Sequence, residues 1–186
     1  DNGSRLNTIL HHLRGAGYWV GNSNAIILNS KKHCGAAQNR ERLFIVAYHS
    51  KYFKKNYFNA DFVEAKDAVD LWSIVDKNKE VGSQYYLDEG NKYAQMIRKS
   101  SIENGDNRLF QIRRVEARAC PVNTCPTLTA NMGGGGHNVP FVIDNVGVRK
   151  LTVEECLLLQ GYLDADVIFP PDMGNNSKYA MIGNAI

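Results

Sequence analysis

The chain has 186 residues, of which 44% are hydrophobic and 22% are charged. This length suits one domain with a core, and the balance excludes a chain that is disordered throughout. Because no apolar run approaches the roughly 18 residues of a membrane span, we expect none. The segment that begins at Asp1 has no basic and apolar secretory leader. A net charge of +3 is too small to indicate a nucleic-acid partner by itself.

The cysteine pattern indicates packed thiols. The sequence contains Cys34, Cys120, Cys125 and Cys156. No C-x2-C pair is present, and a zinc site would have to recruit His137 across a loop, so we expect no metal. We expect reduced thiols, mostly packed in the core of a cytoplasmic protein.

The first 50 residues alternate helical and extended patterns. The apolar residues of one helical face are Leu6, Ile9, Leu10 and Leu13. Their spacing predicts a helix over 5–14. Apolar stretches predict strands over 18–28 and 41–48. A helix followed by two strands indicates the edge of an α/β sheet.

The middle of the chain, 51–148, is less regular. It has Lys- and Asn-rich segments and a predicted helix near 61–75. Regular patterning returns after it. Thr152 and Glu155 fit a capping box, which predicts the start of a helix, and Gly161 stands where a left-handed residue would end it.

The first candidate site lies in a stretch that we expect to be extended over 38–46. The two-residue period of a strand places Gln38, Arg40 and Arg42 on one face. Two close guanidinium groups repel each other unless an anionic or polar group lies between them, and a phosphate or a base edge suits their donors. The alternative is a solvated strand end with Glu41 as ion-pair partner.

The second candidate site is the Gly-rich segment 127–138. Its glycines allow a partner to approach the backbone closely. It is not a Walker loop, and its Thr, Asn and His side chains suit base edges in a groove. The candidate DNA-binding residues are Thr127, Thr129, Asn131, Gly133, Gly134 and Gly135. Upstream, Arg113, Arg114 and Arg118 could hold phosphates, which position the protein without specifying a sequence. The alternative is a flexible surface loop.

The third candidate is 179–186, Tyr-Ala-Met-Ile-Gly-Asn-Ala-Ile, a strand-like or turn segment that is a weak signal alone. In this order, the segments resemble the C-terminal half of a cytosine-C5 DNA methyltransferase of the bacterial restriction–modification type. Segment 35–42 resembles that family's G-x-P/A-Q-x-R-x-R motif, and 149–162 resembles its R-x-L-T-x-x-E-x-x-x-L-Q-G-F/Y motif. Segment 179–186 resembles its closing Y-x-x-I-G-N-A/S-V motif, and 126–136 resembles the end of its target-recognition region.

The resemblance implies an α/β fold. We expect the C-terminal part of a Rossmann-like, S-adenosylmethionine-dependent methyltransferase sheet with an inserted, irregular target-recognition domain. Residues 1–50 would end the catalytic domain, 51–148 would form the recognition domain, and 149–186 would return to the catalytic domain. The family's F-x-G-x-G cofactor loop is missing, and so is its nucleophilic cysteine in Pro-Cys-Gln. The chain should therefore be inactive alone.

The resemblance also implies roles for single residues. Arg40 and Arg42 would face a cytosine flipped out of the duplex, with Gln38 near the DNA. Arg42 would stabilise charge that develops on the ring. Arg149 would pair with a DNA phosphate. The residues on the S-adenosylmethionine side would be Tyr162, Asn184 and Ala185. An alanine at this last position replaces the family's commoner serine.

The implied partners are double-stranded DNA and the missing N-terminal half, in a cytoplasmic protein encoded by a bacterium or phage. Because the sequence stops while still apolar, at Met181, Ile182 and Ile186, we expect a piece of a longer chain. One alternative is a natural split enzyme whose partner chain supplies the other half. Others are a non-catalytic DNA-binding module, which would use Arg113, Arg114 and the glycines, and an RNA cytosine methyltransferase.

Overall fold

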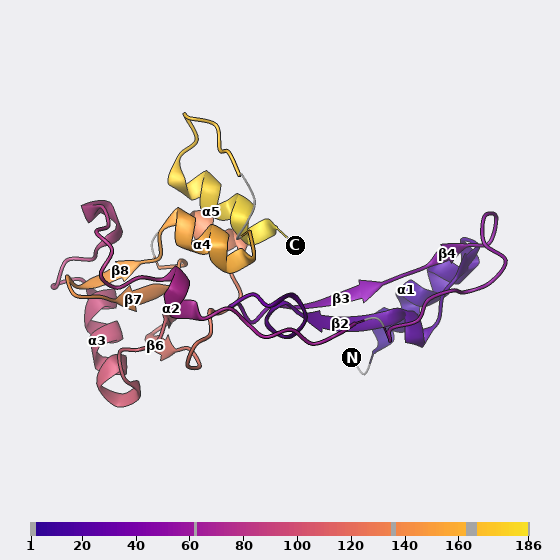
Figure 1. The fold of residues 1–186 in the computed structure, drawn as a ribbon, viewed down its shortest axis with the longest axis horizontal. Helices are drawn as coiled ribbons and strands as arrows, with labels where there is room; N and C mark the ends of the chain where they lie inside the picture. Colours follow the sequence, from indigo (N-terminus) through magenta and orange to yellow (C-terminus); the bar gives the residue numbers. More distant parts are fainter. Residues whose placement is uncertain (1–2, 62, 135–136, 163–166, 186) are drawn as a thin grey trace.

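The computed structural model describes residues 3–61, 63–134, 137–162 and 167–185. Figure 1 shows two parts: an elongated N-terminal arm, which holds the elements up to β4, and a body that holds the elements from α2 onward. Within the described ranges, no helix is long and apolar enough to cross a membrane.

The arm consists of one helix and two short antiparallel strand pairs. Its elements are α1 (Ser4–Gly15), β1 (Tyr18–Trp19), β2 (Ala25–Asn29), β3 (Glu41–Ile45) and β4 (Tyr48–His49), with β1 paired to β4 and β2 to β3. The helix predicted over 5–14 is confirmed. The strands predicted over 18–28 and 41–48 are each split in two. The cause is Asn24, whose buried amide accepts from Gly21 N (2.9 Å) and donates to Val46 O (2.7 Å), so that both strands are interrupted at the same level.

The chain after β4 returns along the hairpin toward the body (Figure 1). Its backbone pairs with the arm: Lys66 N donates to Lys32 O (2.7 Å) and Val69 N to Gly35 O (2.8 Å). Amides used in this way cannot form an i to i−4 ladder. The predicted helix near 61–75 is therefore wrong over most of its length, and only α2 (Leu71–Ile74) forms, while residue 62 lies outside the described ranges.

The body contains a four-stranded antiparallel sheet in the order β6-β5-β7-β8. Its strands are β5 (Phe110–Arg113), β6 (Glu116–Ala119), β7 (Phe141–Ile143) and β8 (Val148–Lys150). Helix α3 (Lys92–Asn104) covers one face, where Ala94 and Ile97 pack in a cluster with Phe110, Phe141 and Val148. The expectation that 51–148 is less regular is confirmed for the described residues of 51–91, where α2 and the 3₁₀ turn Ser83–Tyr85 form, whereas α3 and the strands make 92–148 more regular than expected.

After β8 come α4 (Val153–Gln160) and α5 (Asn175–Asn184), which pack against each other. The capping box is confirmed: Glu155 N donates to Thr152 Oγ1 (3.1 Å), Thr152 N donates to Glu155 Oε2 (2.7 Å), and Gly161 follows with φ 110°. The strand-like or turn segment expected over 179–186 is wrong, because most of it is the end of α5. Tyr179 and Ile182 form the buried face of that helix, and the Tyr179 hydroxyl donates to Leu151 O (2.6 Å).

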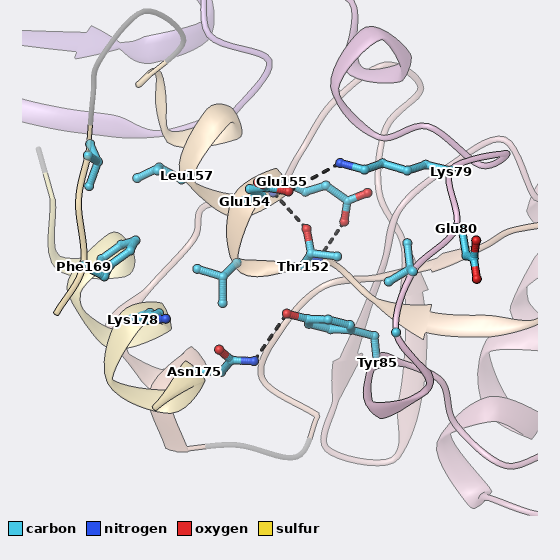
Figure 2. A pocket seen from close by; sticks show the side chains of 14 residues that line it. Lys79, Glu80, Tyr85, Thr152, Glu154, Glu155, Leu157, Phe169, Asn175 and Lys178 are labelled. Carbon is cyan, nitrogen blue, oxygen red and sulfur yellow. Dashed lines mark hydrogen bonds and ion pairs between the residues drawn. The ribbon is translucent and has the colours of Figure 1, made fainter. Parts of the chain in front are cut away.

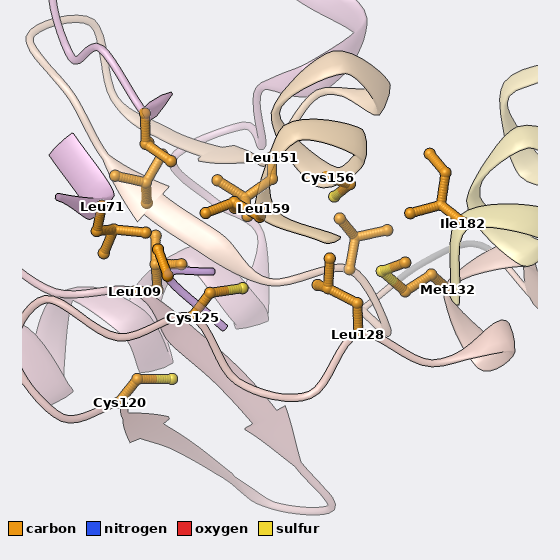
Figure 3. Close-up of a cluster of buried hydrophobic side chains, with 14 of the residues drawn as sticks. Leu71, Leu109, Cys120, Cys125, Leu128, Met132, Leu151, Cys156, Leu159 and Ile182 are labelled. Carbon is orange, nitrogen blue, oxygen red and sulfur yellow. The ribbon is translucent and has the colours of Figure 1, made fainter. Parts of the chain in front are cut away.

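One hydrophobic core joins these elements (Figure 3). Its members come from α2, β7, α4, α5 and the segments that connect the elements, and include Leu71, Leu109, Cys125, Leu128, Met132, Val142, Leu151, Cys156, Leu159 and Ile182. Residues on both sides of position 148 therefore share one packed interior.

Candidate functional site

The segment 38–42 keeps the predicted two-residue alternation. Gln38 and Arg40 are buried, with 0% and 6% of their surface exposed, whereas Asn39 and Glu41 are exposed. Arg42 is half-buried, and its Nη1 donates to the backbone carbonyl of Glu41 (2.7 Å). The expected open, polar face therefore exists for Arg42, but the expectation is wrong for Gln38 and Arg40, because both lie inside the body with partners of their own.

The guanidinium of Arg40 binds three backbone carbonyls. Nη1 donates to Leu128 O (2.6 Å), and Nη2 donates to Gly183 O (3.3 Å) and Ala185 O (2.6 Å). Its buried Nε has no acceptor among the residues that the structure describes. Burial lowers the pKa of Arg40, and the neighbouring positive charge of Arg42 lowers it further. Arg40 thus joins the start of the Gly-rich segment to the end of α5.

Gln38 extends this arrangement. Its Oε1 accepts from Leu128 N (2.9 Å), and its Nε2 donates to Gln160 Oε1 (2.8 Å). Gln160 Nε2 in turn donates to Ala185 O (2.8 Å), the carbonyl that Arg40 also contacts. We call these three side chains, Gln38, Arg40 and Gln160, the polar junction.

Two glycines let α5 lie directly on the 3₁₀ turn Ala130–Gly134. A Cβ at Gly183 would lie 2.1 Å from the carbonyl carbon of Thr129, and one at Gly133 would lie 2.6 Å from Ala180 Cβ. Neither position has room for a side chain. The backbone of α5 therefore touches the backbone of the Gly-rich segment.

Over 127–134, the Gly-rich segment is not the loose loop that we considered as an alternative. Thr127 donates its hydroxyl to Asn39 O (2.7 Å), and Gly133 packs against α5. Thr129, Asn131 and Gly134 are exposed. The predicted DNA-binding residue Gly135 lies outside the described ranges. The structure thus leaves two side chains of this set, Thr129 and Asn131, directed to the exterior.

The residues expected on the cofactor side meet the polar junction. Ala185 is half-buried and its carbonyl is occupied, and Asn184 precedes it as the exposed last residue of α5. Tyr162 is half-buried, and its phenol raises the pKa of Arg40, against the larger effect of burial. The structure therefore brings Arg40, Tyr162, Asn184 and Ala185 to one place.

The three predicted phosphate-binding arginines line a separate, open groove of about 510 Å³ at the β5–β6 turn. The groove is lined by Ile112, Arg113, Arg114, Glu116, Arg118, His137 and Asn138. Arg114 occupies the turn with φ 55°, and Arg118 lies 3.7 Å from Glu116 with both side chains mostly exposed. Arg113, Arg114 and Arg118 thus form a basic surface that includes the far end of the Gly-rich segment.

Arg149 does not belong to any open site. It is fully buried, its Nε lies 2.8 Å from Asp144 Oδ2, and its Nη2 lies 2.8 Å from Glu155 Oε1. Burial would lower the pKa of Arg149, but the hydrogen bonds and charges of Glu155 and Asp144 outweigh it and raise the pKa. The predicted phosphate contact is therefore wrong, because two internal carboxylates already pair with this guanidinium.

Three of the cysteines are buried, as predicted, and Cys34 is exposed. Burial raises the pKa of Cys120 to about 11 and raises the pKa values of Cys125 and Cys156 well above the ordinary range. Such thiols are poor nucleophiles. In the described ranges, no three His, Cys, Asp or Glu side chains gather as metal ligands would.

A further pocket of about 450 Å³ lies where segment 79–85 faces the starts of α4 and α5 (Figure 2). Lys79 Nζ pairs with Glu154 Oε2 at 3.4 Å, and Asn175 Nδ2 donates to the Tyr85 hydroxyl at 3.3 Å. This pocket could not be predicted from the sequence, because its walls come from segments that lie far apart in the chain.

The whole chain, residues 1–186, matches the family model described as C-5 cytosine-specific DNA methylase. Type II methyltransferase M.Bsp6I of Bacillus sp. (strain RFL6) is 33% identical over 191 residues, which cover 100% of this chain and 56% of the relative. Type II methyltransferase M.HpaII of Haemophilus parainfluenzae is 29% identical over 207 residues, which cover 100% of this chain and 52% of the relative. The chain therefore spans about half the length of these curated relatives.

Solved structures share the fold at low sequence identity. A mutant of Spodoptera frugiperda DNMT2 superposes with a TM-score of 0.64 at 14% identity, covering 100% of this chain and 59% of that one. S. pombe Dnmt2 methyltransferase gives 0.62 at 15% identity, covering 98% and 56%. The mixed α/β fold thus corresponds to part of a methyltransferase. Since the family match extends from the first residue to the last, the chain belongs to the C-5 cytosine-specific DNA methylase family.

Proposed function

We propose that this chain is the C-terminal half of a type II cytosine-C5 DNA methyltransferase, and that it supplies DNA recognition and part of the base and cofactor pockets. Residues 1–50 and 149–186 would belong to the catalytic part, and 51–148 to the recognition part. One observation carries the proposal. Arg40 binds both Leu128 and the end of α5, so the three segments that resemble family motifs or the recognition region meet at one point.

On the base side, Arg42 is the residue that we assign to the cytosine. Methylation at C5 begins with addition of a thiolate at C6, which places negative charge on the ring. A preorganised guanidinium stabilises such charge. Arg42 is half-buried, and its hydrogen bond to the Glu41 carbonyl uses only Nη1. Since no cysteine of this chain follows a proline, as the nucleophile of the resembled Pro-Cys-Gln motif does, the attacking thiol would come from the remaining half.

On the cofactor side, Asn184 and Tyr162 would hold S-adenosylmethionine, which supplies the methyl group when bound. The residues present fit this role in part. The Asn184 side chain is exposed at the end of α5, and Tyr162 is half-buried. Ala185 would contribute only its position, because its carbonyl already accepts from Arg40 and Gln160.

On the DNA side, two surfaces would act differently. The open groove with Arg113, Arg114 and Arg118 would hold phosphates, which set the position of the duplex. Thr129 and Asn131 are exposed, short and uncharged, and would contact base edges.

The arm offers a surface on which the remaining half would pack. β2 and β3 form a sheet of two strands, so each has a free edge. Ile27 and Leu43, which are paired across these strands, are 66% and 48% exposed. Such hairpins are marginally stable alone and gain stability when a larger sheet or a helix covers them.

Transfer of tritiated methyl groups from S-adenosylmethionine to DNA tests the proposal. The chain is assayed alone, and in the complete protein translated from the gene that encodes it. We expect incorporation at cytosine C5 by the complete protein and none by the chain alone. If the complete protein binds specific DNA without incorporation, the non-catalytic DNA-binding module becomes the better account. Incorporation into RNA alone would favour the RNA methyltransferase.

A further inference from the structure

We infer that Arg40 is a positioning residue that locks the end of α5 to the Gly-rich segment, so that Asn184 and Thr129 belong to one rigid unit. In this role Arg40 does not touch the base. The inference deepens the proposed function and rests on it, because Asn184 lies on the proposed cofactor side and Thr129 on the proposed DNA side. The unit would couple the binding of S-adenosylmethionine to the binding of DNA.

The buried charge of Arg40 is balanced differently from that of Arg149. Arg149, the other buried arginine, has Asp144 and Glu155 as ion-pair partners. Arg40 instead donates to carbonyls, two of which, Gly183 O and Ala185 O, lie at the end of α5. The last carbonyls of a helix lack partners within the helix and carry the negative end of its dipole. A cation at this position both satisfies them and is stabilised by them.

The shape of the guanidinium also matters for this role. Nη1 serves Leu128 and Nη2 serves Ala185, so one planar fork bridges two segments that lie far apart in the sequence. A lysine ammonium has no such fork and cannot hold both segments in the same geometry. The two glutamines of the polar junction add one hydrogen bond to each of these residues: Gln38 accepts from Leu128 N, and Gln160 donates to Ala185 O.

Close packing of the two backbones lies beside the hydrogen bonds of Arg40. Because a Cβ at Gly183 would lie 2.1 Å from the carbonyl carbon of Thr129, the two backbones have no room to move toward each other. Thr129 follows Leu128 and Asn184 follows Gly183, so each candidate contact residue is adjacent to an anchored one. A ligand that orders one of them would lower the cost of ordering the other.

Hydrogen–deuterium exchange of the chain itself tests the rigid unit without any need for activity. We compare Arg40→Lys with the matched variant Arg42→Lys, which keeps the same change of side chain two residues along the same segment. We expect Arg40→Lys to speed exchange about tenfold or more in both 127–134 and 175–184, as the loss of charge-assisted hydrogen bonds implies. Exchange in β5 to β8 should stay the same. If Arg40→Lys does not fold, Gln160→Ala, which removes the second donor to Ala185 O, is used in its place.

Faster exchange in only one of the two segments, or equal effects of Arg40→Lys and Arg42→Lys, would overturn the inference. Global acceleration that includes the sheet would also count against it, because it would show a general loss of stability.

Kinetics of the complete protein then test the coupling. A positioning role predicts that Arg40→Lys raises KM for DNA and for S-adenosylmethionine together, by about fivefold or more, with kcat changed less. A fall in kcat alone would instead mean that Arg40 acts on the base. If the unsubstituted complete protein transfers no methyl groups, the proposed function fails, whereas the exchange result still decides whether the rigid unit exists.

Discussion

At the scale of single residues, the two buried arginines show two ways in which a protein stabilises a buried positive charge. Arg149 is paired with Asp144 and Glu155, and its positive charge lies between these two carboxylates inside the body. Arg40 depends on backbone carbonyls and keeps a buried Nε for which the described residues offer no acceptor. The first charge is balanced by carboxylates, whereas the second is stabilised by backbone carbonyls.

Removing the guanidinium of Arg149 should destabilise the body strongly. Arg149→Ala leaves two buried carboxylates without their ion-pair partner, so we expect the free energy of unfolding to fall by about 3–5 kcal/mol. Equilibrium unfolding in urea measures the loss. Lys79→Ala is the control, because Lys79 and Glu154 form an exposed pair that should contribute less than about 1 kcal/mol. Similar small losses for both variants would contradict the role given to Arg149.

In the complete protein, substitution of Arg42 should affect mainly the rate of methyl transfer, and substitution of Arg118 mainly the affinity for DNA. We expect Arg42→Ala to slow methyl transfer about 100-fold or more, as loss of a preorganised charge does, and to change DNA affinity less. Arg118→Ala should weaken DNA binding and reduce the slope of log K against log salt by about 1, with turnover at saturation kept. Single-turnover kinetics and a salt titration measure both. Unchanged turnover for Arg42→Ala would exclude it as the residue that stabilises the ring.

The thiols should differ sharply in reactivity. At neutral pH, we expect iodoacetamide to modify Cys34 in the folded chain and to leave the other three cysteines unmodified, because burial protects them and raises their pKa values. Raising the pH should not expose them until the chain unfolds. Mass spectrometry of peptides with and without denaturant measures this, and modification of Cys125 or Cys156 in the folded chain would disprove the packing.

At the scale of elements, the sequence predicted best those features that depend on neighbouring residues. The helix over 5–14 follows from its apolar spacing, and the start of α4 follows from Thr152 and Glu155. The strands over 18–28 and 41–48 were predicted too long, because a buried Asn24 interrupts both. Helix α5 was missed because a glycine near its end disfavours a helix, while the reason for that glycine is a contact with a distant segment.

Gly183→Ala tests this reason. In an ordinary helix, alanine in place of glycine stabilises by about 0.5–1 kcal/mol. Here the added Cβ would overlap the carbonyl of Thr129, so we expect a loss of about 1–3 kcal/mol and displacement of α5. Gly15→Ala in α1 is the control, since nothing lies within 4 Å of its Cβ position. Thermal unfolding compares the two, and a gain in stability for Gly183→Ala would contradict the close contact.

At the scale of the whole molecule, the body and the arm differ in how much they bury. The body has a continuous core that combines residues from before and after position 148. The arm exposes Ile27 and Leu43 on a sheet of two strands. This contrast fits a chain that spans about half of its curated relatives, because a catalytic sheet shared with the remaining half would cover the arm.

Polar substitutions of Ile27 and Leu43 should lower the free energy of unfolding substantially only in the complete protein. We expect Ile27→Ser with Leu43→Ser to change unfolding of the isolated chain by less than about 1 kcal/mol, since both side chains already contact solvent. In the complete protein, where we propose that they are buried, the loss should reach about 3 kcal/mol or more. Ile102→Ser is the control, because Ile102 lies on α3 of the body and is 86% exposed. Equal effects in the two forms would mean that nothing covers the arm.

The sequence by itself determined the family, the alternation of Gln38, Arg40 and Arg42, and the local signals of α1 and α4. These depend on spacing and on neighbouring residues, which a sequence displays directly. Only the tertiary structure decided which arginines are buried and what they bind. Arg40 donates to carbonyls 88 and 145 residues away. Because every residue has a backbone carbonyl, the sequence does not indicate which carbonyls bind this guanidinium. Arg149 forms an internal ion pair and Arg42 stays half-buried because of how distant parts of the chain pack together, and the sequence does not display that packing.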